Sequence, residues 1–160
     1  MNPHTDVGTA DDVRTADLTA LRRRRAELRE SINALENAVA APASARAVIW
    51  GERVHAALTR IAEDFREHIE VTEGPDGLHQ MILAGDLRLA NAVAALAQEH
   101  EYISADIAAM LAGTEPPVTP SDVDAVRDGV IGLLGRLVGH RQRGADLVYE
   151  AYETDIGGGD

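Results

Sequence analysis

The sequence contains no cysteine and no lysine, and only 3% of its residues are aromatic. The lack of cysteine excludes disulfides, thiolate metal sites and thiol catalysis, and it agrees with a cytoplasmic location. The lack of lysine and the formal charge of −12 argue against a nucleic-acid binder, because neutralising phosphates requires clustered basic residues. With so few aromatic residues, the interior has to be packed from aliphatic side chains.

Long hydrophobic runs are also missing. No stretch of about 18 apolar residues occurs, and the N-terminus lacks the basic start and apolar stretch of a secretory signal, so we expect no association with a membrane. The one basic run, Arg22–Arg25, is diluted by acidic residues on the same predicted helix. We interpret three of its arginines as a solvated face.

What the sequence does have is helical periodicity over most of its 160 residues, 45% of which are hydrophobic. Apolar residues recur every three or four positions, and Pro- and Gly-containing breaks separate the periodic segments, which predicts an all-α protein with one domain at 10–156. Short turns between long amphipathic helices are typical of an antiparallel up-down-up-down four-helix bundle. The predicted helices cover about 10–39, 45–72, 86–111 and 120–155, with a short extra turn at 78–84 and polar tails at 1–9 and 157–160.

Three histidines interrupt these apolar stripes. His68, His100 and His140 each occupy an inward position, and each lies on a different predicted helix. A single histidine on an apolar face is most often a core residue whose polar atoms are satisfied. One on each of three helices, with almost no other polar residue on those stripes, indicates that the imidazoles gather at a ligand site.

The remaining histidines do not fit this pattern. His55 lies about 140° around its helix from the apolar stripe, His79 falls in the break after the second helix, and His4 is in the N-terminal tail. A further polar residue does lie on a stripe. Arg25 is predicted to point inward, where it either extends its guanidinium to the edge of the bundle or pairs with a buried carboxylate.

Carboxylates are scarce where a metal in a bundle would need them. An iron or manganese site commonly takes a carboxylate four residues after a histidine, but Thr72 and Gly144 occupy those positions. The acids closest to the correct face are Asp64 and Glu73. Gly144 costs about 1 kcal/mol relative to alanine in a helix, and it leaves space beside His140 for water, a ligand or a cofactor.

Three segments together resemble the hemerythrin-like, or HHE cation-binding, family. They are Asp64–Glu73 on the second predicted helix, Gln98–Ile103 on the third, and His140–Gly157 on the fourth. The resemblance covers about residues 44–157, and it rests on the order and spacing of the segments. It implies a four-helix bundle that holds a non-haem di-iron centre and that binds or senses dioxygen, nitric oxide or iron, or acts as an oxidase.

The resemblance carries only part of the ligand set over to this sequence. His68, His100 and His140 match ligand histidines, whereas the glutamates expected at Thr72 and Gly144 are absent and the first predicted helix has no histidine. Without bridging carboxylates, the charges of two iron ions lack compensation. A site with fewer ligands than the family's di-iron centre, and with as few as one metal ion, is therefore implied.

Three functions are compatible with the sequence. The first is a metal-binding protein in which one iron or other divalent ion is held by the three histidines, assisted by Asp64 or Glu73, for oxygen or small-molecule redox chemistry as an oxidoreductase. The second is a haem protein in which one of the histidines ligates the iron and the gap at Gly144 admits the macrocycle. The third is a metal-free bundle with a binding or structural role.

The candidate partners follow from these functions. A small-molecule ligand or substrate is expected for the first two. The stripe of the first helix either seals the bundle or pairs with a second copy of the chain as a homodimer.

Overall fold

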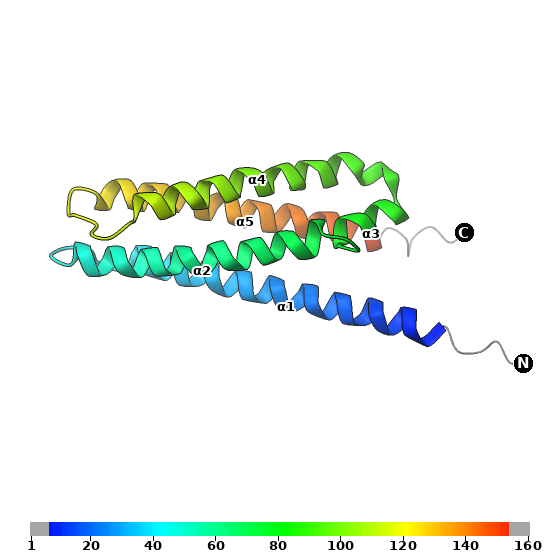
Figure 1. Ribbon diagram of the computed structural model, residues 1–160. Coiled ribbons are helices and arrows are strands. Elements are labelled where there is room, and N and C mark those ends of the chain that lie inside the picture. Colours follow the sequence, from blue (N-terminus) through cyan, green and yellow to red (C-terminus); the bar gives the residue numbers. More distant parts are fainter. Residues whose placement is uncertain (1–6, 154–160) are drawn as a thin grey trace, which may run out of the picture.

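The computed structural model describes the backbone of residues 7–153 and the side chains of residues 18–152. This part of the chain is helical apart from its turns and contains no strand, and four long helices pack together (Figure 1). The long helices are α1 (Val7–Ala40), α2 (Ala47–Glu73), α4 (Ala90–Gly113) and α5 (Val123–Glu153). Two short elements, α3 (Leu78–Gly85) and the 3-10 helix η1 (Leu87–Leu89), connect α2 to α4. None of the helices within the described ranges is both long and apolar enough to cross a membrane.

The helix boundaries differ from the predicted ones where side chains form local turns. α4 begins at Ala90 and not at 86, because the Asp86 side chain accepts a hydrogen bond from the backbone N–H of Arg88 and closes η1 first. α5 begins at Val123 and not at 120, because Thr119 and Asp122 form a hydrogen-bonded turn before it. α1 starts at Val7, earlier than the predicted residue 10. Residues 1–6 and 154–160, which include the predicted end of the fourth helix at 155 and the predicted tail at 157–160, lie outside the described residues.

The buried aliphatic side chains form two clusters. The larger cluster joins the four long helices, and its most completely buried members are Leu35, Val54, Leu58, Ile61, Val130 and Leu133. The smaller cluster lies where α3 packs against the other helices, and it includes Leu78, Ile82, Leu96 and Leu147. In the sequence of α4, His100 falls between Leu96 of the smaller cluster and Ile103 of the larger one. The interior is thus divided into two apolar parts, and a histidine stands at the division.

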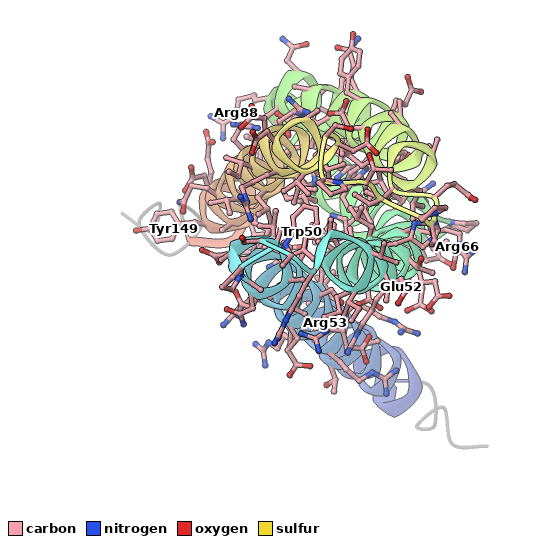
Figure 2. The ribbon with its side chains drawn as sticks, turned by 90° about the vertical axis from the view of Figure 1, so that its left-hand side faces the viewer. Trp50, Glu52, Arg53, Arg66, Arg88 and Tyr149 are labelled. Atoms are coloured by element: carbon pink, nitrogen blue, oxygen red, sulfur yellow. The ribbon has the colours of Figure 1, made fainter. Side chains whose placement is uncertain are left out.

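Trp50, near the start of α2, packs at the end of the bundle far from α3. Its side chain is 2% exposed, and it lies between the helix ends in the end-on view (Figure 2). The guanidinium of Arg127 stands 5.3 Å from the centre of the indole ring and also donates hydrogen bonds to the carbonyls of Val39 and Ala41. This contact joins α5 to the end of α1.

Gly51 gives a test of the packing at this end. A Cβ added at Gly51 would lie 2.4 Å from the Cβ of the buried Val118, so Gly51→Ala is expected to destabilise the protein by about 1–3 kcal/mol. Gly135→Ala is the matched control, because no heavy atom lies within 4 Å of the added methyl group, and helix propensity should make it stabilising by up to about 1 kcal/mol. Urea denaturation of both variants measures the difference. Equal effects at the two positions would show that the contact with Val118 is not close.

Candidate metal centre

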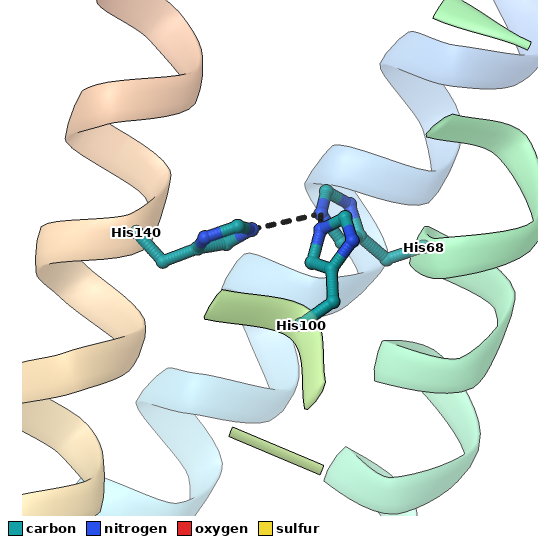
Figure 3. A group of neighbouring side chains, drawn as sticks. All are labelled: His68, His100 and His140. Carbon is teal, nitrogen blue, oxygen red and sulfur yellow. Dashed lines mark hydrogen bonds between the residues drawn. The ribbon is translucent and has the colours of Figure 1, made fainter. Parts of the chain in front are cut away.

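Three imidazoles from three helices converge in the interior. His68 of α2, His100 of α4 and His140 of α5 are 8%, 2% and 3% exposed, and Figure 3 shows their rings pointing toward one another. The Nε2 atom of His68 lies 3.2 Å from Nε2 of His100 and 3.3 Å from Nε2 of His140. The sequence prediction that these histidines gather at one place agrees with this arrangement.

The connection between α2 and α4 brings the histidines to one level. His68 lies near the end of α2, whereas His100 is ten residues into α4, so they meet only if the chain runs past His68 before it returns. Residues 74–89 provide this extension, because α3 and η1 occupy them and pack against the rest of the bundle. The predicted short helix at 78–84 corresponds to α3.

Two glutamates fix the orientation of two of the rings. Glu73 accepts a hydrogen bond from Nδ1 of His100, and Glu99 accepts one from Nδ1 of His140 at 2.7 Å. An ionised carboxylate can only accept, so the proton of each imidazole is assigned to Nδ1. The lone pair of each Nε2 then points into the space between the rings. A carboxylate behind a histidine is also the usual support of a metal-bound imidazole.

This geometry fits a metal ion. With His100 and His140 protonated on Nδ1, only His68 can supply a proton to the two short Nε2 contacts, and its own Nδ1 is buried without a hydrogen-bond partner. A cation between the rings would be bound by all three lone pairs. Nitrogen ligands at about 2.0–2.1 Å from a tetrahedral metal lie about 3.3–3.4 Å from one another, close to the two observed separations. The three side chains are also the one group in the described residues whose ligand atoms lie close enough together, within 4.8 Å, to share an ion.

Burial keeps His68 and His100 neutral. It lowers the pKa of His68 to about 3, with further lowering from the nearby charges of His100, His140 and Arg25. Burial likewise lowers the pKa of His100 to about 3, helped by His140 and His79. Neutral imidazole is the form that binds metals, so these two side chains are ready to act as ligands at physiological pH.

Glu99 is held in its ionised form. Burial opposes its ionisation, but hydrogen bonds from Arg143 and His140 outweigh burial and lower the pKa of Glu99. Arg143 donates from Nε to one carboxylate oxygen while His140 donates to the other. The negative charge behind His140 is therefore permanent at neutral pH.

Phe65 lies against the triad on the side of the larger apolar cluster. Its ring centre is 5.6 Å from that of His68, 5.7 Å from that of His100 and 6.0 Å from that of His140. The Phe65 side chain is 1% exposed. It closes one side of the triad with an apolar surface.

The other predicted site residues, Asp64, Glu73 and Gly144, have three different positions relative to the triad. Asp64 lies outside the group of ligand atoms, where it accepts a hydrogen bond from Ser31 and lies 3.7 Å from Arg60. Glu73 reaches the site as the partner of His100 Nδ1 and not as a member of that group. Gly144 lines a cavity beside the triad, and a Cβ added there would meet nothing within 4 Å.

His79 is a correction to the sequence analysis, which set it aside because it falls in the break between two long helices. It is 7% exposed, and its ring stacks on that of His100 with centres 5.9 Å apart and planes 2° from parallel. Burial lowers the pKa of His79, although the charge of Glu73 opposes this. Leu78 and Ile82 are buried on the same short helix, so the periodicity of residues 78–82 held the signal that was missed.

A cavity of about 160 Å³ adjoins the triad. Its polar lining comes from the three imidazoles, His79, Thr72 and three arginines, and its apolar lining comes mainly from leucines. An engineered cavity of about 150 Å³ holds one benzene molecule, so this space suits a ligand of similar size. Haem is several times larger than this cavity.

No protein family, characterised protein or solved structure matches the chain in comparisons of its sequence and fold. The hemerythrin-like resemblance accordingly rests on the residues of this sequence.

The lowered histidine pKa values make the stability of the metal-free protein depend on pH. An unfolded histidine binds its proton with a pKa of about 6.5, whereas His68 and His100 stay neutral in the fold until about pH 3. The unfolded state therefore binds more protons below about pH 6.5, and stability is full above this value and lost as the pH falls. We expect a loss of about 2–4 kcal/mol between pH 7 and pH 5 in urea denaturation. The loss should be smaller in His68→Leu, and equal stability at both pH values would contradict the buried neutral state.

Proposed function

We propose that this chain is a hemerythrin-like four-helix bundle that binds one divalent metal ion through His68, His100 and His140, and that it acts in oxygen or small-molecule redox chemistry. The observation that carries the proposal is the convergence of three buried Nε2 atoms, two of them backed by carboxylates on Nδ1. Packing alone does not account for three buried imidazoles, because leucines would fill the same space without the cost of burying polar atoms.

The path of the chain supports the family resemblance. The turns between the long helices lie at alternate ends of the molecule in Figure 1, which is what an up-down-up-down bundle requires. The histidines come from α2, α4 and α5, the helices that carry the three segments resembling the family. Their Nε2 atoms point into the interior, where bundle proteins place metal sites.

A single ion accounts for the residues present. Thr72 bonds back to the carbonyl of His68 at 2.8 Å, and Gly144 has no side chain, so neither position supplies a bridging carboxylate. The negative charges near the site are those of Glu73 and Glu99, which lie behind the imidazoles. Two carboxylates offset the charge of one divalent ion, and they leave a second ion without compensation.

The donor set bears on the choice of metal. Imidazole nitrogen suits iron, zinc, copper and nickel, and the resemblance favours iron among them. Bound iron would supply coordination positions open to dioxygen or another small molecule. The chain's own residues hold the ligand atoms in place: Glu73 and Glu99 fix two rings, and Phe65 keeps water from one side.

The cavity argues against the haem alternative, as its volume suits a molecule near the size of benzene. A metal-free bundle with a structural role is opposed by the polar atoms it would bury, above all the unpaired Nδ1 of His68. We therefore carry neither alternative forward.

Metal content tests the proposal directly. The purified protein is expected to contain about one metal ion per chain, measured by elemental analysis, and His68→Ala, His100→Ala and His140→Ala should each lose most of it. His55→Ala is the matched control, because His55 lies on α2 and bonds to Thr114 away from the triad. Circular dichroism checks that the variants are helical. Metal retained by all three triad variants would refute the site.

Restoring the carboxylates tests the relation to the family. The double variant Thr72→Glu, Gly144→Glu supplies acids at the positions where the family places them, and the open space at Gly144 accepts a longer side chain. We expect its metal content to rise from about one ion to about two per chain. Gly135→Glu on the exposed face of α5 serves as the control for added charge. A double variant that still binds one ion would count against a site derived from a di-iron centre.

A further inference from the structure

Arg25 lies at the edge of the histidine triad, and none of the carboxylates among residues 18–152 neutralises its charge. It lies on the core-facing stripe of α1, as predicted, and its side chain is half-buried and lines the cavity beside the triad. The sequence allows either a solvent-directed guanidinium or a pair with a buried carboxylate. Within residues 18–152 no carboxylate bonds to its guanidinium, and burial lowers the pKa of Arg25 with no acidic group opposing the shift. Its positive charge contributes, after burial, to the lowered pKa of His68.

The other charges around the cavity have the same sign. Arg29 and Arg141 also line it, and the lining that the structure describes includes no acidic residue. The nearest carboxylates, Glu73 and Glu99, are bonded to the Nδ1 atoms, which face away from the convergent Nε2 atoms. In a chain with a net charge of −12, this cavity is therefore locally positive. A divalent ion on the triad would make it more so.

The rest of the cavity wall is apolar. Its aliphatic lining consists of Leu28, Leu78, Leu96, Ala145 and Leu147. The volume of about 160 Å³ holds roughly six non-hydrogen atoms, by comparison with benzene in a cavity of similar size. A molecule that matches both surfaces has one anionic end and a short hydrocarbon body.

We propose that the cavity binds a small organic carboxylate, whose carboxylate group pairs with the guanidinium of Arg25 and whose hydrocarbon body packs on the leucines. A planar guanidinium matches a carboxylate with two parallel hydrogen bonds, which a half-buried site strengthens. An inorganic oxyanion such as phosphate fits the charge but leaves the apolar wall uncovered. The inference rests on the proposed metal site, and it names the class of molecule that shares the site with the metal.

Isobutyrate is a suitable probe, and isobutyramide is its neutral counterpart of the same shape. Titration calorimetry on the metal-loaded protein is expected to show binding of isobutyrate, at least about tenfold weaker binding of isobutyramide, and no displacement of isobutyrate by equimolar inorganic phosphate. Equal binding of acid and amide would overturn the role of charge. Displacement by phosphate would contradict the claim that the ligand is an organic molecule. A lack of isobutyrate binding would refute the proposal as a whole.

Variants of α1 assign the contact. Arg25→Met keeps the length of the side chain without the charge, and it should weaken isobutyrate binding by about 10- to 100-fold. Arg22→Met is the control, because Arg22 is exposed on the same helix and does not line the cavity. Unchanged affinity in Arg25→Met would refute the contact. The metal content of the same samples reports on the triad separately, since Arg25 is not among the ligand atoms.

Discussion

The arrangement of the interior depends on one electrostatic constraint: the Nε2 atoms of His100 and His140 each lie about as far from Nε2 of His68 as two ligands of a single ion lie from one another. The lone pairs of His100 and His140 face His68, whose Nε2 is the one of the three that can carry a proton, and the surrounding residues hold the rings in place. Glu73 and Glu99 hold two rings from behind, and Phe65 packs against all three. The apolar clusters on either side supply the packing energy that offsets the cost of burying polar groups.

The sequence predicts the long helices and the inward histidines because both depend on local periodicity. An apolar stripe with a histidine in it reports which side of a helix is buried, whatever the helix packs against. The level at which the histidines meet depends on α3 and η1, whose path after Gly74–Gly77 is set by tertiary contacts and not by periodicity. The position of His79 beside His100 depends on this path, although the buried residues of α3 recur with helical spacing.

The carboxylates show a different limit of sequence analysis. Asp64 and Glu73 were selected by helical angle, but angle alone does not tell whether an acid reaches an ion or the far nitrogen of a ligand. In the structure, Asp64 accepts a hydrogen bond from Ser31, and Glu73 accepts one from His100. Glu99 adjoins His100 in sequence and yet serves His140 on the neighbouring helix. Such pairs depend on how two helices are rotated relative to one another, and the periodicity of one helix does not carry this information.

Phe65 closes the side of the triad that faces the larger apolar cluster. Its ring blocks the approach from the larger cluster, and the cavity bordered by Arg25 and Gly144 lies against the same imidazoles. A molecule bound in that cavity would thus stand in the path to the Nε2 atoms. Another molecule could not reach the imidazoles through the cavity while a ligand is bound there. The ligand would therefore also control access to the triad by this route.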